Sequence, residues 1–120
     1  MHIAERTSWE ASPARAYRPA AFAAEGFVHC SEPEQIEAVA NRFFRGRTDL
    51  VLLLIDEARL SASVRRENLE GGDEPFPHVY GPIEREAVVA VAALRPGEGG
   101  LFTLPPDAIR SGTLGDASAT

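Results

Sequence analysis

The sequence is poor in cysteine and has no long hydrophobic run. Its single cysteine, Cys30, excludes an intramolecular disulfide and any metal site built from several cysteines. A lone thiol also fits a reducing compartment. The longest apolar run, Leu50 to Ile55, is far too short to cross a bilayer, and the N-terminal residues lack the basic start and apolar segment of a signal peptide. We therefore expect a soluble, cytoplasmic protein without a membrane partner.

The chain has no excess of basic residues either. Its 12 basic and 18 acidic residues give a net charge of −6, which opposes non-specific binding to nucleic-acid phosphates. Two arginine clusters, at residues 42–47 and 65–66, are expected to be solvated. The 120 residues, 44% of them hydrophobic, suffice for one domain with its own core. We expect a single domain over residues 1–110 and a mobile tail over residues 111–120, which are small and polar.

The hydrophobic pattern predicts a small α+β domain. Apolar residues recur at intervals of three or four from Ile36 to Phe44, which is typical of an amphipathic helix, and Ser31 is its candidate N-cap. The unbroken apolar run at residues 50–55 indicates a central strand buried on both faces. Thr7 and Glu10 have the spacing of a capping box for a first helix. Further strands are expected at residues 2–4, 27–30, 64–67 and 88–94, an exposed loop at 70–75 and a rigid, proline-bounded loop at 76–82.

Three histidines, His2, His29 and His78, are the best candidates for a functional site. His29 lies on an apolar strand just before a helix start, and His78 lies in the proline-bounded segment. Burying an imidazole is costly unless a partner or ligand supplies hydrogen bonds, so each could also be a structural residue with a satisfied partner. Near neutral pH an imidazole can transfer protons or bond a ribose hydroxyl. The wide separation of the three matches no zinc motif, and we expect no metal site.

Other polar residues near these histidines have two interpretations each. Adjacent strand residues point to opposite faces, so Cys30 is expected to face the core rather than to pair with His29 as a nucleophile. Ser31 caps a helix whose first N–H groups could also hold an anionic group. Glu67 is a solvated strand end or a catalytic carboxylate. Tyr80 stacks on a ligand ring or closes the core.

Four segments together resemble a bacterial family, the domain of unknown function 952. They are residues 25–31 (Glu-Gly-Phe-Val-His-Cys-Ser), 40–44 (Ala-Asn-Arg-Phe-Phe), 53–56 (Leu-Leu-Ile-Asp) and 76–82 (Phe-Pro-His-Val-Tyr-Gly-Pro). The opening His2-Ile3 and the later Trp9 also fit, so the resemblance covers residues 2–94. This family is grouped by fold with the ADP-ribosyltransferase-like proteins. The resemblance implies a split β-sheet with flanking helices and a cleft that holds NAD in relatives.

The resemblance also implies a role for each candidate residue. His2 would hydrogen-bond a ribose of NAD, as the first-strand histidine does in that superfamily. The strand and hydroxyl of the second motif, here His29 and Ser31, would line the nicotinamide pocket. Tyr80 would stack on the nicotinamide or another ring. His78 would position or deprotonate the acceptor.

The third motif of that superfamily departs from the usual pattern here. Its members carry a glutamate near the last strands, whereas this region offers His78 and Tyr80, with Glu67 and Glu84 as substitutes. A clear glutamate is also missing in the RNA 2′-phosphotransferase branch, which uses NAD to remove a phosphate. The predicted function is therefore that of an NAD-dependent transferase acting on an unidentified or phosphorylated acceptor. Two alternatives stay open: a non-NAD cyclase, isomerase or hydrolase acting on a small molecule, and a binding module without turnover.

Overall fold

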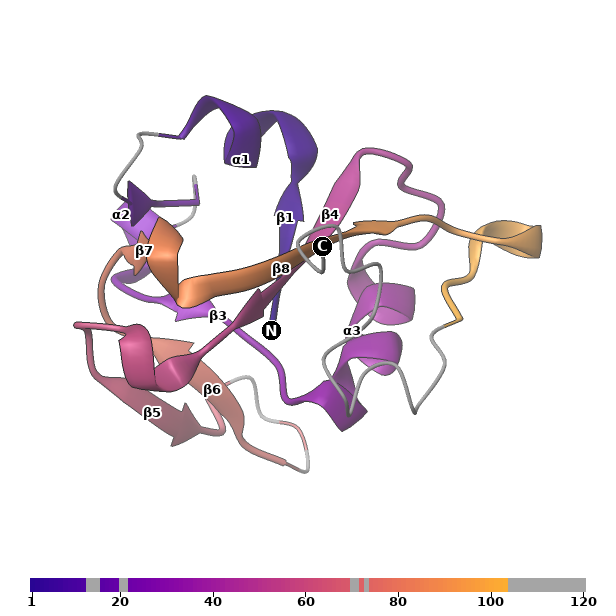
Figure 1. Ribbon diagram of the computed structural model, residues 1–120. Coiled ribbons are helices and arrows are strands. Elements are labelled where there is room, and N and C mark those ends of the chain that lie inside the picture. Colours follow the sequence, from indigo (N-terminus) through magenta and orange to yellow (C-terminus); the bar gives the residue numbers. More distant parts are fainter. Residues whose placement is uncertain (13–15, 20–21, 70–71, 73, 104–120) are drawn as a thin grey trace.

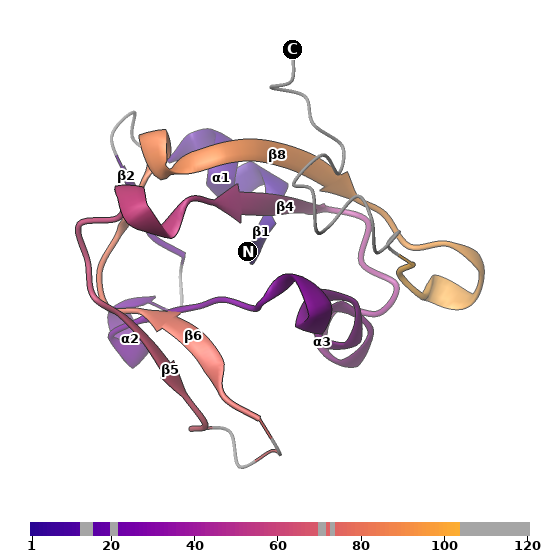
Figure 2. The same ribbon diagram turned by 60° about the horizontal axis from the view of Figure 1, so that its bottom comes forward.

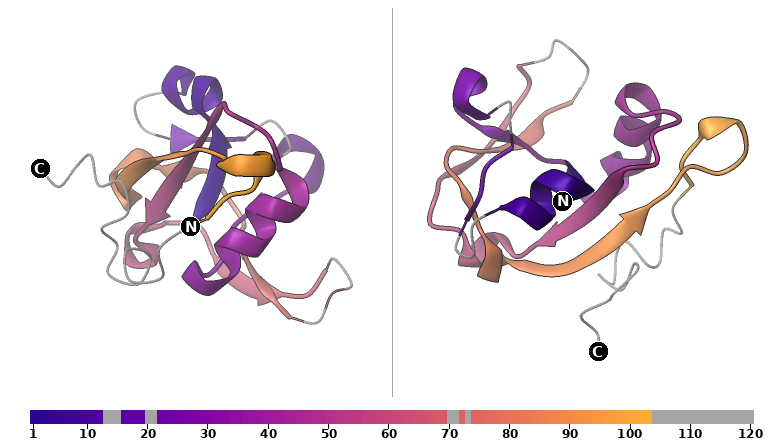
Figure 3. Two further views of the ribbon diagram at one scale, coloured as in Figure 1. Left: turned by 90° about the vertical axis from the view of Figure 1, so that its right-hand side faces the viewer. Right: turned by 90° about the horizontal axis from the view of Figure 1, so that it is seen from above.

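The computed structural model describes residues 1–12, 16–19, 22–69, 72 and 74–103. Its main sheet has the strand order β1-β4-β8, with β1 at His2–Glu5, β4 at Leu50–Ile55 and β8 at Val88–Leu94. Both pairings are antiparallel. The central place of β4, with five of its six residues buried, confirms the prediction from its unbroken apolar run. Figures 1 and 3 show β4 and β8 running side by side.

Each face of the main sheet packs against a helix. On one face, α3 (Ile36–Phe43) buries Ile36 and Ala40 against Leu50, Leu52 and Leu54. On the other, Trp9 of α1 (Arg6–Ala11) packs with Leu53 and with Tyr17 of β2 (Ala16–Tyr17). Because successive strand residues point to opposite faces, β4 contributes to both cores.

A second sheet lies below the main one, beside α3 (Figure 2). It has the order β3-β6-β5, formed by β3 (Val28–His29), β6 (Phe76–Val79) and β5 (Val64–Glu67), and is antiparallel throughout. β2 pairs with β7 (Ile83–Glu84) in a two-stranded ribbon. The remaining elements are α2 (Phe22–Glu25) and four short 3₁₀ turns, η1 (Pro33–Gln35), η2 (Glu57–Arg59), η3 (Arg85–Ala87) and η4 (Glu98–Gly100). The described part of the chain is thus a mixed fold of several small antiparallel sheets and short helices.

The predicted helix caps are wrong in both cases. Glu32, not Ser31, precedes the first turn, and its N–H donates to Gln35 Oε1 at 2.8 Å. α1 begins at Arg6 and has no side-chain cap, so the predicted Thr7–Glu10 capping box does not form. The N–H of Arg6 instead donates to the carbonyl of Asp49 at 2.7 Å. The first cap is therefore still local but shifted by one residue, whereas at α1 a tertiary contact supplies the partner that the local sequence was expected to supply.

The segment predicted as a proline-bounded loop is also different, because its first half is strand β6. Proline disfavours a central strand, since it cannot donate to the ladder. The carbonyl of Pro77 accepts from the N–H of Cys30 at 3.0 Å, just beyond the end of β3. The missing N–H of Pro77 lies on this same side, past the paired residues, so the pairing of β6 with β5 continues.

The C-terminal expectations lie mostly outside the described residues. Phe102 is buried against the α3 face of the main sheet. It is held by Asn41 of α3, which donates to the Phe102 carbonyl at 3.0 Å and accepts from its N–H at 2.6 Å. The predicted tail at residues 111–120 and the end of the domain at residue 110 are not among the described residues, and neither is part of the loop at 70–75.

Candidate functional site

The outer face of the second sheet carries a group of aromatic and imidazole rings. His29 of β3 lies directly opposite His78 of β6, and Arg65 of β5 lies on the other side of His78. Residues two apart share a face of a strand, so Phe27, Tyr80 and Glu67 join this face. We call Phe27, His29, His78, Tyr80 and Glu67 the ring cluster.

The four rings of the ring cluster are in direct contact. The imidazole of His78 stacks on Phe27, with ring centroids 4.3 Å apart and planes at 24°. His29 meets His78 edge-on at 5.3 Å, and Phe27 lies 5.4 Å from Tyr80. His78 is completely buried, whereas His29 is exposed and Phe27 and Tyr80 are half-buried. The accessible surface is therefore made by His29, Phe27 and Tyr80, with His78 beneath them.

One carboxylate oxygen of Glu67 links two members of the ring cluster, His78 and Tyr80. His78 Nδ1 donates to Glu67 Oε1 at 3.0 Å, and the Tyr80 hydroxyl donates to the same oxygen. The hydrogen bond from Tyr80 lowers the pKa of the Glu67 carboxyl most, and the hydrogen bond from His78 lowers it further. The contact with Glu67 raises the pKa of Tyr80. Glu67 is thus more than a solvated strand end, since it orients both side chains.

His29 offers the accessible imidazole of this face. Its Nε2 lies 3.0 Å from Oε1 of Glu25, at the end of α2. Both side chains are about two-fifths exposed, so the pair is open to exchange with a ligand group. An imidazole beside a carboxylate can accept and return a proton.

His2 is buried and reaches the site through the backbone. Its Nδ1 lies 2.6 Å from the carbonyl oxygen of His29. A carbonyl only accepts, so Nδ1 carries the hydrogen and Nε2 carries a lone pair, which meets no hydrogen-bond partner among the described residues. Burial lowers the pKa of His2 to about 4, so the ring is neutral at pH 7. The three histidines are therefore connected: His2 contacts the backbone of His29, and the ring of His29 contacts the ring of His78.

Ser31 and Cys30 lie apart from the ring cluster. Beyond β3 the chain leaves the second sheet: the N–H of Ser31 donates to the Met1 carbonyl at 2.8 Å, and the Met1 amino group donates to the Ser31 carbonyl at 2.9 Å. Cys30 is buried, and burial raises the pKa of its thiol to about 11. The prediction that Cys30 faces away from His29 is confirmed, and Ser31 is separated from His29 as well.

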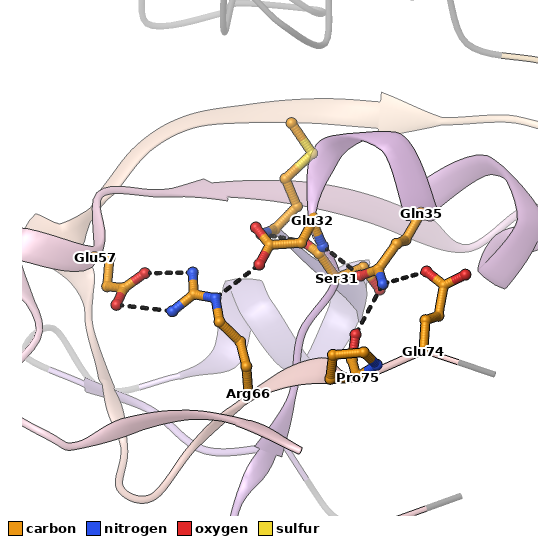
Figure 4. Close-up of polar contacts among 8 residues, drawn as sticks. Ser31, Glu32, Gln35, Glu57, Arg66, Glu74 and Pro75 are labelled. Atoms are coloured by element: carbon orange, nitrogen blue, oxygen red, sulfur yellow. Dashed lines mark hydrogen bonds and ion pairs between the residues drawn. The ribbon is translucent and has the colours of Figure 1, made fainter. Parts of the chain in front are cut away.

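Cys30 and Ser31 instead line a pocket of about 280 Å³ on the inner side of the second sheet. Figure 4 shows its charged rim, in which Arg66 of β5 reaches two carboxylates from other segments. Arg66 Nε donates to Glu32 at 2.8 Å, and Arg66 Nη2 donates to Glu57 at 2.8 Å. Sequence reasoning missed this rim, because it took Arg66 for a solvated residue. The sequence offered one signal for it: adjacent residues of a strand point to opposite faces, so Arg65 and Arg66 could not both lie on the outer face of β5.

The two substitute carboxylates predicted for the third motif have different positions. Glu67 belongs to the ring cluster, whereas the carboxylate of Glu84 accepts from the N–H of Ser61 at 3.2 Å, away from the rings. Within the described ranges, no three histidine, cysteine or acidic side chains gather closely enough to hold a metal ion. No helix in that part of the chain has the length and apolarity needed to cross a membrane.

Comparison with known proteins places the chain in a family. Protein CC0527 from Caulobacter crescentus has a similar crystal structure, with 33% sequence identity and a TM-score of 0.77 over 90% of this chain and 95% of that chain. Its solution structure is 34% identical, with a TM-score of 0.71 over 82% of this chain and 86% of that chain. No curated protein matches the chain. The model of the family described as "Protein of unknown function (DUF952)" matches residues 3–91, and the chain belongs to this family.

Proposed function

We propose that the protein binds NAD or a related nucleotide on the ring cluster and transfers part of it to an acceptor, as ADP-ribosyltransferase-like proteins do. The observation that supports this most is the row of the exposed His29 and the half-buried Phe27 and Tyr80 above the buried His78. It combines flat apolar rings with one accessible proton carrier. A site that binds a nucleotide and transfers part of it can use the rings to stack on the base and the proton carrier to activate the acceptor.

Binding would rest on stacking and charge. A nicotinamide or adenine ring would lie on Phe27 and Tyr80, in the offset arrangement that aromatic rings prefer. The guanidinium of Arg65 lies 5.1 Å from the centre of the Tyr80 ring and is exposed. From there it can pair with a phosphate of the same ligand. Together these three side chains supply the contacts for a ring joined to a phosphate.

His29 is the residue we assign to proton transfer. NAD supplies an activated ribose carbon, so the protein needs to position an acceptor hydroxyl and take its proton. The imidazole of His29 is accessible, and its Nε2 now donates to Glu25. When a ligand displaces Glu25 and the ring takes its other tautomer, Nε2 is free of its hydrogen and can accept this proton. His78 is buried below Phe27, so we assign it to positioning rather than to direct contact with an acceptor.

The remaining predicted contacts stay predictions. The lone pair on Nε2 of His2 matches a ribose hydroxyl as its donor, yet the atom is buried, so this contact requires a local opening. Ser31 lies in the inner pocket and takes no part in the nucleotide site proposed here.

Calorimetric titration with NAD tests the proposal. We expect saturable binding to the wild-type protein, and Phe27→Ala should weaken it by about 5- to 150-fold because one stacked ring is worth roughly 1–3 kcal/mol. Phe43→Ala is a matched control, since Phe43 is exposed on α3, away from the rings. Release of nicotinamide, followed by mass spectrometry, should be lost in His29→Ala while NAD still binds.

Two results would overturn the proposal in different ways. No binding of NAD at millimolar concentration ends the nucleotide version. Equal binding by wild type and Phe27→Ala places the nucleotide elsewhere. A different metabolite retained on the purified protein, and lost in Phe27→Ala, would favour a non-NAD enzyme that uses the same rings.

A further inference from the structure

The pocket on the inner side of the second sheet has apolar walls drawn from four strands. β4 contributes Leu54 and Ile55, β5 contributes Val64, and β6 and β8 contribute Val79 and Val89. Its volume of about 280 Å³ lies just below the range of about 300–1,000 Å³ that is common for ligand sites. The walls and the size therefore suit a small ligand with an apolar body.

The rim of this pocket is a continuous polar network (Figure 4). Arg66 bridges Glu32, which follows β3, and Glu57, which follows β4. Glu32 is joined in turn to Gln35, whose amide donates to the carbonyl of Pro75 at 2.9 Å. The network ties together segments that are distant in sequence and holds the guanidinium of Arg66 at the mouth.

The charges at the rim restrict the class of ligand. Two carboxylates, Glu32 and Glu57, flank the guanidinium of Arg66. The terminal amino group of Met1 lines the same pocket as a second basic group, so the acidic and basic groups balance. A charged ligand group, such as the diphosphate of a nucleotide, would lose its hydration there without a net opposite charge to compensate for the loss. Of the five N–H groups of arginine, Arg66 uses three for the two carboxylates, so two remain to donate to a ligand oxygen.

We propose that this pocket is a second binding site, for a small, neutral and mainly apolar molecule that carries a carbonyl oxygen. The apolar part lies among Leu54, Val64 and Val79, and the carbonyl oxygen accepts from Arg66. This site faces the opposite side of the second sheet from the ring cluster, so the two sites bind different classes of molecule.

Three probes of equal chain length test the charge selectivity: hexanamide, hexanoate and hexylamine. Each is titrated into ¹⁵N-labelled protein, and backbone resonances are followed by NMR. We expect hexanamide to give saturable shifts at Cys30, Ile55, Val64 and Arg66. Hexanoate and hexylamine should each bind at least about tenfold more weakly, a difference of about 1.4 kcal/mol.

Variants locate the site. Val89→Phe narrows the mouth at a position that is 43% exposed and so tolerates a larger side chain, and it should weaken hexanamide binding about tenfold or more. Arg66→Met removes the donor and should weaken it similarly. Phe27→Ala, on the opposite face, is the matched control and should leave hexanamide binding unchanged.

The proposal fails if hexanamide gives no saturable shift at tens of millimolar, or if its shifts map to the ring cluster. It also fails if hexanoate or hexylamine binds as well as hexanamide, or if Val89→Phe and Arg66→Met bind hexanamide as the wild type does. The proposal concerns a different face of the sheet from the NAD proposal, so either can fail alone.

Discussion

At the scale of single residues, surroundings hold three titratable side chains in one protonation state. Burial keeps His2 neutral by lowering its pKa to about 4 and keeps Cys30 a thiol by raising its pKa to about 11. The hydrogen bond to Glu67 keeps Tyr80 a phenol. Because none of these three changes charge near pH 7, none of them is assigned the proton transfer of the proposed site.

The lowered pKa of His2 predicts acid sensitivity. A histidine whose pKa is about 4 when folded and about 6.5 when unfolded binds its proton mainly in the unfolded state. Its contribution to stability is therefore complete above about pH 6.5 and is lost as the pH falls toward about 4, by on the order of 3 kcal/mol. Urea unfolding measured across this pH range should show the loss.

The control for this prediction is His2→Asn. The asparagine amide can still donate to the carbonyl of His29 but does not titrate. Its free energy of unfolding should fall less between pH 7 and pH 4 than that of the wild type. Parallel curves for the two proteins would show that other groups dominate the acid response.

The buried thiol of Cys30 predicts slow alkylation. The thiolate is the reactive form, and at about pH 8 it is suppressed by burial and by the raised pKa. Iodoacetamide should modify the native protein at least about tenfold more slowly than the urea-unfolded protein, as measured by mass spectrometry. Similar rates in both states would contradict the buried position.

At the scale of secondary-structure elements, strand pairing determines which side chains meet. The register of β3, β6 and β5 places His29, His78 and Arg65 in one row. Glu67 lies two residues from Arg65, on the same face, and so reaches His78 and Tyr80. A slip of one residue in any of these pairings would turn the row to the other face.

Glu67→Gln tests the link between β5 and β6. Loss of the negative acceptor should bring the pKa of Tyr80 down toward its ordinary value near 10. Tyr17, whose pKa burial raises to about 12, should be unaffected and is an internal control. Absorbance near 295 nm, followed against pH, reports both tyrosines. An unchanged Tyr80 titration would rule out the bond to Glu67.

Asn41→Ala tests how α3 holds the segment after β8. The substitution removes both hydrogen bonds between the Asn41 side chain and the backbone of Phe102. Because Phe102 is buried, its N–H and C=O lose partners that water does not easily replace. We expect a loss of about 1–3 kcal/mol in the free energy of unfolding. Asn41→Asp should be milder, since it keeps the acceptor.

At the scale of the whole molecule, the sheets share side chains and should unfold together. Ile55 and Val88 pack against both the core around Trp9 and the core around Val79. Such shared residues couple the stability of the two cores, because neither can open without exposing them.

Val79→Ala tests this coupling. Removing two buried methyl groups should cost about 1–3 kcal/mol. If the protein unfolds as one unit, the fluorescence of Trp9, in the other core, should report the same lowered midpoint as far-ultraviolet circular dichroism. A Trp9 transition that does not move would show that the second sheet opens separately.

Several elements follow directly from local pattern. Residues 50–55 and 88–94 form strands as predicted, because unbroken or β-rich apolar runs have few other ways to be buried. Residues 64–67, mostly charged, also form the predicted strand, which pairs with β6. The helix that ends at Phe43 follows from its periodic apolar face. The cap predicted at Thr7 and the first half of the loop predicted at residues 76–82 were wrong, because their backbone groups find partners in distant segments. The cap predicted at Ser31 was wrong by one residue, since Glu32 and Gln35 form it.

The sequence by itself determined the α+β character, the central strand β4 and the family, since these depend on periodicity and on motifs that are contiguous in the chain. It also singled out His2, His29 and His78. Only the tertiary structure decided that these histidines are in contact and that His78 is buried while His29 is exposed. It also decided that Ser31 lines the pocket on the opposite face of the second sheet. The physical reason is that alternation within a strand is local, whereas the face that meets solvent and the strand that lies opposite depend on long-range pairing.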